Sequence, residues 1–443
     1  MSRLALVVAA LAACTPATTS APPGEPEPLC PEPTRPAKIT ADPSAQIATV
    51  TTAAPPLLLR NARVIDGNGG PPIANTDVLI VAGRISRVGP KLAAPPSPGR
   101  TLDLAGRTLL PGLIDTHVHM ASDPQASHAE GIARDVASTD ADAALRGAAN
   151  ARATLLAGFT TVRNVGGGLA DRSLRDAIAG GLVPGPRMLV ANHSIGITGG
   201  HCDDTNGLRP DLFGGPPDFT VGIADGPDEL RKAVRHQIKL GADVIKICAT
   251  GGVLSQGDAV GAPQLTLPEM QAVVDEAVRA GRKVAAHAHG TVGIKEAVLA
   301  GVHSIEHGSV LDSETIALMK RRGTYLVPTV SVGEYVEHAA ASGKLSPESA
   351  AKAREIAPRM RESVVKAHKA GVKLAFGTDA DAIVAATRDA ADLLGLVSLG
   401  RIEVGYIADL VVVEGDPLAD ITALGRPSLV IQGGQIVRPP TWP

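Results

Sequence analysis

The sequence has few aromatic residues and little net charge. Only 2% of its 443 residues are Phe, Tyr or Trp, so it lacks the aromatic platforms on which nucleic-acid bases stack. Its formal net charge is -3, and its Lys and Arg residues form no basic stripe. Nucleic acid is therefore not an expected partner. With 44% apolar residues, the chain is instead large enough for a substantial core plus an accessory domain.

The N-terminus resembles an export signal followed by a tether. Arg3 precedes an apolar run over residues 4–13, which is too short to cross a bilayer. The run ends in Leu11-Ala12-Ala13-Cys14, which resembles the lipobox of bacterial lipoproteins, where the cysteine is lipidated and becomes the mature N-terminus. Residues 1–13 are thus a predicted signal peptide. Residues 14–56, rich in Pro, Thr, Ser and Ala, are a predicted disordered tether.

These features predict an exported protein of the periplasm or cell envelope, attached to the membrane only through a lipid on Cys14. A simple secretory peptide cut nearby is the alternative. Export permits disulfides. Cys30 lies in the tether, and the sequence leaves open whether Cys202 and Cys248 pair.

Two blocks at opposite ends of the chain read as short strands separated by turns. Residues 57–110 alternate apolar and polar side chains around turn sequences such as Asn68-Gly69-Gly70. Residues 396–437 do the same around Gly415-Asp416-Pro417. Neither block makes a satisfactory domain alone. Together they predict one small β-sandwich built from both ends of the chain.

Residues 111–395 alternate strand-like runs with helical patterns. Helices are predicted at 140–157, 230–240 and 268–280, the last with Pro268 near its start and Gly281 beyond its end. Eight strand-like runs begin at Leu113, Phe159, Arg187, Val244, Lys283, Val302, Thr324 and Lys373. Strands that each lead into a helix predict an α/β fold, a (β/α)₈ TIM-type barrel, in which functional residues gather at the C-terminal strand ends.

Potential metal ligands lie at those strand ends. His117 and His119 are two residues apart, so both side chains point to one face of the first strand. Further strands end in His287 and His289, in His307 and in Asp379. A lone His-x-His is more often a pair of ordinary core histidines. Its repetition at one structural position favours a metal site.

Lys246 lies inside an apolar strand, Val244-Ile245-Lys246-Ile247. A charged lysine is costly to desolvate there, so we expect its pKa to fall and a neutral amine to persist. A neutral amine can take up carbon dioxide and become an anionic oxygen ligand. The alternative is a buried stem whose ammonium group reaches the barrel mouth.

At this point the chain resembles the amidohydrolase superfamily, from about residue 57 to 437. Within it the likeness is greatest to Xaa-Pro dipeptidases (prolidase-like), imidazolonepropionase-related hydrolases and ochratoxin-type carboxypeptidases. The motifs that carry it are Gly112-Leu113-Ile114-Asp115-Thr116-His117-Val118-His119, Gly158-Phe159-Thr160-Thr161-Val162-Arg163, Ile245-Lys246, Ala286-His287-Ala288-His289-Gly290, Glu306-His307-Gly308 and Gly377-Thr378-Asp379-Ala380.

The resemblance implies two divalent metal ions, zinc or similar ions. His117, His119 and Asp379 would hold one ion, His287 and His307 would hold the second, and carboxylated Lys246 would bridge the two. Four imidazoles, a carboxylate and a carbamate suit such ions.

The resemblance also implies hydrolysis of an amide bond in a small molecule such as a dipeptide, an Xaa-Pro-like compound or an N-acyl amino acid. The metals would generate a bound hydroxide that attacks the carbonyl, and Asp379 would pass its proton to the leaving amine. His289 and His201 are candidates for contacts with the substrate, and a structural hydrogen bond is the alternative role for each. The loop over residues 250–265 is expected to lie over the barrel mouth and to help set specificity.

Two departures from the family pattern stand out. Asn164 occupies a position where relatives often have Asp. The segment between Asp379 and the last helical pattern, residues 382–394, is short, so part of one pocket wall is expected to be missing. The alternatives are a mononuclear cyclic-amide hydrolase of the imidazolonepropionase type, which Lys246 argues against, and a metal-binding lipoprotein inactivated by that short connection. Whether the chain forms a homo-oligomer stays open.

Overall fold

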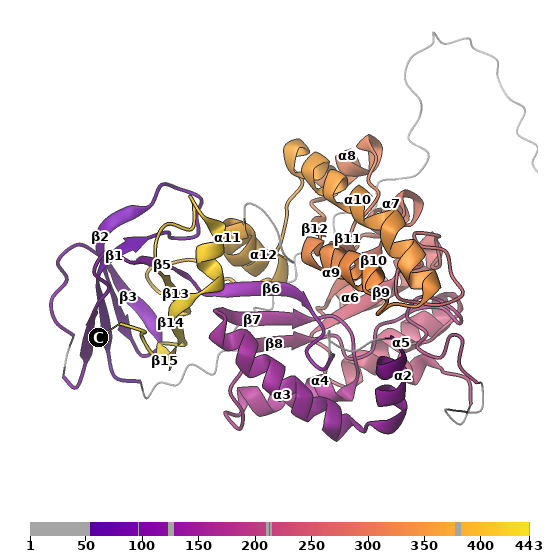
Figure 1. The fold of residues 1–443 in the computed structure, drawn as a ribbon, viewed down its shortest axis with the longest axis horizontal. Helices are drawn as coiled ribbons and strands as arrows, with labels where there is room; N and C mark the ends of the chain where they lie inside the picture. The colour runs from indigo at the N-terminus through magenta and orange to yellow at the C-terminus, as the bar shows by residue number, and fades with distance from the viewer. Residues whose placement is uncertain are drawn as a thin grey trace, which may run out of the picture. The chain divides into compact units, whose positions relative to one another are not determined.

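A computed structural model describes residues 54–442, apart from residues 96, 123–127, 210–211, 213–214 and 377–381 (Figure 1). The predicted signal peptide and Cys14 lie outside the described residues, as does the predicted tether up to residue 53. The predicted metal ligand and proton acceptor Asp379 lies outside them too.

The two ends of the chain share one eight-stranded sheet. Its order is β15-β14-β13-β5-β1-β2-β3, with β4 also paired to β1. The strands are β1 (Leu57–Val64), β2 (Ile73–Val81), β3 (Arg84–Gly89), β4 (Arg100–Asp103), β5 (Thr108–Pro111), β13 (Leu410–Val413), β14 (Pro427–Gln432) and β15 (Gln435–Arg438). The two blocks meet where β5 and β13 pair antiparallel, with Leu110 opposite Val411.

This sheet is hydrogen-bonded without a break, and it curls so that distant strands share one core. Ile85 of β3 and Leu429 of β14 belong to the same buried cluster as Leu59 of β1. The curl is completed where Ala408 N donates to the Gly83 carbonyl at 2.9 Å. Alternating apolar residues from both ends of the chain therefore fill one interior, as the sequence pattern predicts.

The centre of the chain forms parallel strands in two groups. One group is β6 (Leu113–Val118), β7 (Phe159–Asn164) and β8 (Arg187–Val190), and the other is β9 (Val244–Cys248), β10 (Lys283–Ala288), β11 (Ser304–His307) and β12 (Tyr325–Val327). Ile195 joins the groups, because its N–H donates to the Lys246 carbonyl at 2.8 Å and its carbonyl accepts from Cys248 N at 2.9 Å.

The eighth barrel position is occupied by residues 373–376, which bond to both neighbours. Leu326 N of β12 donates to the Lys373 carbonyl at 2.9 Å, and Thr116 N of β6 donates to the Phe376 carbonyl at 3.1 Å. Backbone hydrogen bonds therefore run all the way round the barrel. The predicted (β/α)₈ barrel with an additional β domain is confirmed.

Helices cover the outside of the barrel (Figure 1). They are α2 (His128–Ala137), α3 (Asp140–Leu156), α4 (Leu169–Ala179), α5 (Gly226–Lys239), α6 (Leu267–Arg279), α7 (Thr291–Ala300), α8 (Ser313–Arg322), α9 (Val330–Ala341), α10 (Pro347–Ala370), α11 (Ala382–Val384) and α12 (Ala390–Leu394), with short helical turns at Phe219–Val221, Ala385–Asp389 and Ile421–Gly425. The three predicted helices are present as α3, α5 and α6. Thr139 and Thr266 begin α3 and α6 with capping boxes.

Two helical features differ from the sequence expectation. A helical hairpin, α9 and α10, follows β12 where one barrel helix is usual. The predicted helix over 382–394 is interrupted by a π-helical turn, Ala385–Asp389, before it ends at Gly395 with φ of 81°. Such turns widen a helix locally and are frequent near functional sites.

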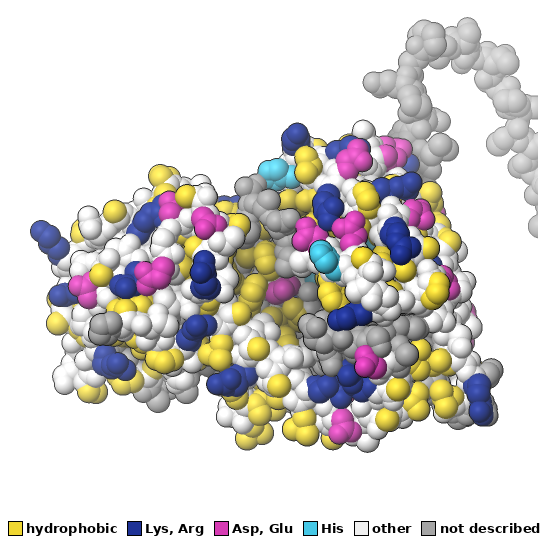
Figure 2. Space-filling model, viewed as in Figure 1, with side chains coloured by type: hydrophobic (Ala, Val, Ile, Leu, Met, Phe, Trp, Pro, Cys, Tyr) yellow, Lys and Arg dark blue, Asp and Glu magenta, His cyan; other side chains and the backbone are white. Residues whose placement is uncertain are grey.

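Charged residues tie the curled sheet to the barrel. Arg187 of β8 and Asp409, which precedes β13, form an ion pair in which both side chains are nearly fully buried. Gly433 N donates to the same aspartate at 2.7 Å. On the face in Figure 2, Lys and Arg side chains are interspersed with Asp and Glu. Among the described residues, none of the helices has the length and apolar character needed to cross a membrane.

Candidate metal centre

The C-terminal ends of the barrel strands surround a cavity of about 730 Å³. The predicted site residues that line it are His117, His119, His201, Lys246, His287, His289 and His307. Every predicted site residue within the described chain therefore reaches one cavity. The predicted loop over the mouth contributes as well, because Val253 and Ser255 are among the lining residues.

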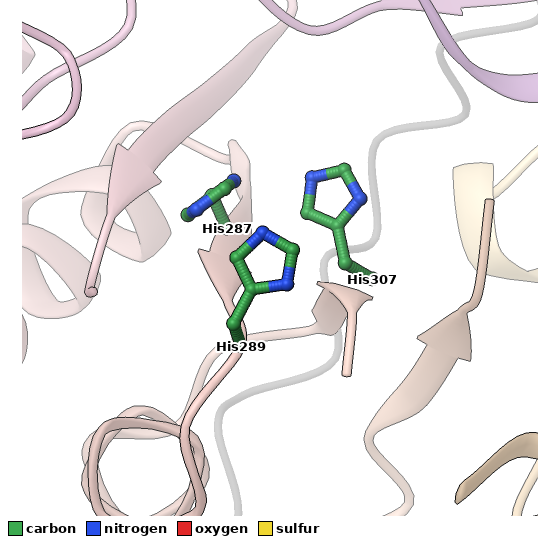
Figure 3. Close-up of side chains that lie close together, drawn as sticks. All are labelled: His287, His289 and His307. Carbon is green, nitrogen blue, oxygen red and sulfur yellow. The ribbon is translucent and has the colours of Figure 1, made fainter. Parts of the chain in front are cut away.

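Three histidines form the tightest group in this cavity (Figure 3). His287 and His289 come from the end of β10 and His307 from the end of β11, and one ligand nitrogen from each lies within 4.8 Å of the others. The ring centroids of His287 and His307 are 4.7 Å apart. The buried Nε2 of His287 has no hydrogen-bond partner among the described residues. A buried polar atom without a partner is costly, and a metal ion would satisfy it.

The first strand brings two more imidazoles to this group. His117 lies 5.0 Å from His307, measured between ring centroids, and 5.3 Å from His119. His117 Nδ1 bonds to Glu306 Oε2 at 2.7 Å, and His119 Nδ1 bonds to the Gly166 carbonyl at 3.0 Å. A carbonyl and an ionised carboxylate accept only, so both Nδ1 atoms carry the proton. Each Nε2 then keeps a lone pair for a metal, an arrangement typical of metal-bound histidines.

His307 is held in an unusual backbone conformation. Its φ is 73°, and Thr329 at the end of the next strand has φ of 47°. The two residues bond to each other, with His307 Nδ1 2.7 Å from Thr329 Oγ1. Left-handed conformations are costly for side chains of this size and persist at sites that constrain them. The strain turns the His307 ring into the cavity.

Glu306 and Arg163 were not assigned a role by the sequence, although both occur in the family motifs. Arg163 is 2% exposed and donates to Glu306 Oε1 at 2.8 Å, while Ser304 donates to the same oxygen. The arginine and His117 hold the pKa of the Glu306 carboxyl at about 2 despite its burial. A signal was available, since an arginine inside the predicted barrel strand that begins at Phe159 requires an anion as partner if it is buried.

Lys246 is buried at the floor of the cavity, with 4% exposure. Burial lowers the pKa of its ammonium group to about 8, although Glu306 opposes the change. About one lysine in ten is then neutral at pH 7. The sequence expectation of a desolvated lysine with a reduced pKa is therefore confirmed in direction, and the neutral form is the one that reacts with carbon dioxide.

Burial also keeps the histidines neutral. Desolvation and then the charge of Lys246 lower the pKa of His117 to about 3, and desolvation followed by His201 and Lys246 lowers the pKa of His289 to about 3. The pKa of His287 and of His307 is also well below the usual value, first because of burial and then because of neighbouring histidines. A neutral imidazole is the form that binds a metal, so the protein supplies competent ligands at neutral pH.

Asn164 takes part in orienting His119. Its Nδ2 donates to the Gly166 carbonyl at 3.1 Å, the same oxygen that accepts from His119. Its Oδ1 accepts from Met120 N at 2.6 Å. An aspartate at this position could not donate to that carbonyl. Asn164, which departs from the family pattern, therefore helps to orient the predicted metal ligand His119.

His201 stacks on His287, with ring centroids 4.0 Å apart. It comes from the loop after β8, and its neighbour Cys202 forms a disulfide with Cys248 at the end of β9. This pairing answers the question that the sequence left open. The crosslink fixes the His201 loop directly beside the strand that carries Lys246.

The donor set fits a divalent metal ion. It combines neutral imidazoles whose Nδ1 atoms are engaged, an unsatisfied Nε2 on His287 and a lysine of lowered pKa, all in one cavity. Nitrogen ligands of this kind suit zinc and similar ions. His289, predicted as a substrate contact, is as close to this group as the predicted ligands are.

Comparisons with known proteins agree with this architecture. The sequence model of the amidohydrolase family matches residues 108–383 and 380–437. An ochratoxinase from Aspergillus niger is 33% identical over 415 residues, which cover 84% of each chain. A solved Xaa-Pro dipeptidase with bound methionine is 38% identical, with a TM-score of 0.81 over 86% of this chain and 100% of that one.

A solved prolidase in complex with N-methylphosphonate-L-proline is 33% identical, with a TM-score of 0.78 over 87% of this chain and 100% of that one. These likenesses indicate a barrel hydrolase from a family whose members are usually metal-dependent. The chain belongs to the amidohydrolase family.

Proposed function

We propose that this protein is a metal-dependent amidase that cleaves a dipeptide, an Xaa-Pro-like compound or an N-acyl amino acid. The observation that carries the proposal is the meeting of six neutral imidazoles and buried Lys246 in one cavity. The similarity to a solved Xaa-Pro dipeptidase and to a prolidase bearing a phosphonate analogue of a prolyl dipeptide supports this choice of substrate.

His117, His119 and Asp379 would hold one divalent ion, zinc in the first instance, and His287 and His307 would hold a second. When bound, such ions would supply a water of lowered pKa and polarise the substrate carbonyl. Glu306 keeps the Nδ1 proton on His117 and so directs Nε2 inward. Asp379 accepts a proton from the attacking water and delivers it to the leaving amine.

Lys246 would become a carbamate: the neutral Nζ attacks carbon dioxide, an N–C bond forms, and one proton is released to solvent. The resulting anion would offer two oxygen atoms as ligands for divalent ions. His289 and His201 lie beside the metal positions and are proposed to contact the substrate.

The test combines metal analysis with a substrate screen. Protein purified with zinc and bicarbonate is expected to hold about two metal equivalents and to hydrolyse members of a panel of dipeptides and N-acyl amino acids. A chelator should abolish this turnover. Lys246→Ala should lose metal and turnover together. Lys366→Ala, which removes an exposed lysine of α10, is the matched control and should retain both.

Other outcomes would replace the proposal. One metal equivalent with turnover of a cyclic amide would indicate the mononuclear, imidazolonepropionase-like alternative. Two equivalents without turnover of any amide would indicate a metal-binding protein that the short segment after Asp379 has made inactive.

We further propose that the chain is exported and anchored through a lipid on Cys14. The Cys202–Cys248 disulfide supports export, because such bonds persist in oxidising compartments. Labelling cells with a fatty-acid analogue should mark the wild-type protein and leave Cys14→Ser unmarked. Label on the variant would contradict the assignment.

A further inference from the structure

We propose that Lys352 of α10 is a positioning residue that orients His201 in the active site through Asp258 and Ser255. The proposal rests on the proposed function only in giving His201 a contact with the substrate. It assigns a task to the helical hairpin α9–α10, which stands where one barrel helix is usual.

A continuous chain of polar contacts runs from α10 to the cavity. Lys352 Nζ donates to Asp258 Oδ1 at 2.7 Å, and their side chains are only 9% and 8% exposed. Ser255 Oγ donates to the same Oδ1 at 2.8 Å. Ser255 Oγ also lies 2.8 Å from His201 Nδ1. Two side chains, joined by three polar contacts, therefore connect a buried ammonium group to an imidazole that lines the site.

The direction of these bonds follows from the charges. The Asp258 carboxylate only accepts, and hydrogen bonds to an ionised acceptor are the stronger ones. Ser255 has a single proton, and it is directed to the carboxylate. Its oxygen must then accept from His201, so the proton of His201 lies on Nδ1. His201 consequently presents the lone pair of Nε2 to the cavity, as an acceptor for an N–H or O–H group of the substrate.

The loop that carries Ser255 and Asp258 is docked on α10 by further contacts. Glu348 of α10 accepts from Gly257 N at 3.1 Å. Val253 of the loop packs in a buried cluster with Val336 of α9 and Ile356 of α10. The hairpin therefore fixes the position of the loop, and its Lys352 pairs with the Asp258 carboxylate of that loop.

Gly252 shows how closely this loop approaches His201. A Cβ atom at Gly252 would lie 2.2 Å from Cε1 of the His201 ring. Only glycine leaves room for the imidazole, so the ring is confined by the loop backbone on one side and by the stacked His287 ring on the other. The hydrogen bond that His201 Nδ1 donates to Ser255 Oγ then fixes the rotation of the ring.

Ser255→Ala breaks the chain at its centre without leaving a charge unpaired. It should lower kcat/KM by about 3- to 10-fold, the value of one hydrogen bond, with metal content unchanged. Ser255→Thr keeps the hydroxyl and is the conservative control. Lys352→Met should have the same kinetic effect, while Lys366→Met, an exposed lysine of the same helix, should have none.

The decisive comparison repeats Ser255→Ala and Lys352→Met in a His201→Ala background. If both residues act through His201, neither should lower kcat/KM further there, within about twofold. A full additional loss in that background would overturn the proposal, because a loop that merely supports the barrel would act whether or not His201 is present.

A second measurement does not depend on turnover. In spectra of the zinc-loaded protein with ¹⁵N-labelled histidine, assigned by difference against His201→Ala, His201 should carry its proton on Nδ1 and lose this preference in Ser255→Ala. A proton on Nε2 in the wild type would overturn the proposed direction. If no substrate is found but His201 shows this tautomer, the positioning stands and the proposed function fails. Should Lys352→Met not fold, Ser255→Ala and the tautomer of His201 still decide the outcome.

Discussion

Replacing Glu306 by glutamine should weaken both the fold and metal binding, although Glu306 is not a predicted ligand. The substitution keeps the size of the side chain and removes its charge. Glu306 is fully buried and Arg163 is 2% exposed, so the guanidinium group would remain in the barrel interior without its anion. Breaking a buried pair from one side typically costs about 3–5 kcal/mol of the free energy of unfolding.

The effect on metal comes through His117. In the wild type the carboxylate accepts the Nδ1 proton at 2.7 Å, which fixes the tautomer and the ring orientation. The amide NH₂ of glutamine can donate to Nδ1 and so favour the tautomer with its proton on Nε2, the atom needed for the metal. Loss of such an outer partner lowers metal affinity by roughly 10- to 100-fold.

Urea unfolding of the metal-free protein and zinc titration with a competing chelator measure the two effects separately. Glu362→Gln is the matched control, because Glu362 and its partner Lys366 are 65% and 53% exposed. Its free energy of unfolding should change by less than about 0.5 kcal/mol. If Glu306→Gln binds zinc as tightly as the wild type, the reasoning about His117 is refuted. If it is as stable as the control, the buried pair does not contribute as argued.

Three further predictions follow from other parts of the molecule. Asp379→Asn should retain the fold and lower kcat by roughly 10²- to 10⁴-fold, measured under saturating substrate, whereas near-normal kcat would exclude Asp379 as the proton acceptor. Burial lowers the pKa of His303 to about 4, and its Nδ1 accepts a hydrogen bond from Val284 N. The stability that neutral His303 contributes is therefore fully present above pH 6.5 and is lost as the pH falls towards 4. The loss of unfolding free energy between pH 7 and pH 4.5 should be about 2 kcal/mol smaller in His303→Asn than in the wild type, because the cavity histidines contribute equally to both. Replacing Cys202 and Cys248 by alanine should lower the free energy of unfolding by about 2–4 kcal/mol and shift KM more than metal content, whereas unchanged stability in urea would show that the crosslink is dispensable.

The sequence predicted the barrel and most of its cavity because both depend on local periodicity. Alternation along a strand places His117 and His119 on one face, and the same rule places His287 and His289. A parallel barrel then brings the strand ends together without further information. That the described members of the predicted set line one cavity follows from this geometry.

What the sequence could not supply depends on contacts between distant residues. Arg163 and Glu306 are 143 residues apart, and nothing in the neighbourhood of either residue specifies the other. The same holds for Lys352 and Asp258, 94 residues apart, which connect an inserted hairpin to a loop of the barrel. The π-helical turn at Ala385–Asp389 was missed because its residues fit an ordinary helical pattern and only the packing around it demands the extra residue.

The sheet made from both ends of the chain has a consequence for biosynthesis. β5 is an unpaired edge strand until its neighbour β13 has been translated. Arg63 likewise has no Asp416 to bond with until a residue 353 positions later has been added. Contacts of such sequence separation form late and slowly. A ribosome that stops before residue 410 therefore releases a chain whose N-terminal strands have an unpaired edge and an open apolar face, a substrate for proteases and chaperones. The N-terminal strands therefore cannot reach their folded state until the last strands of the sheet have been translated.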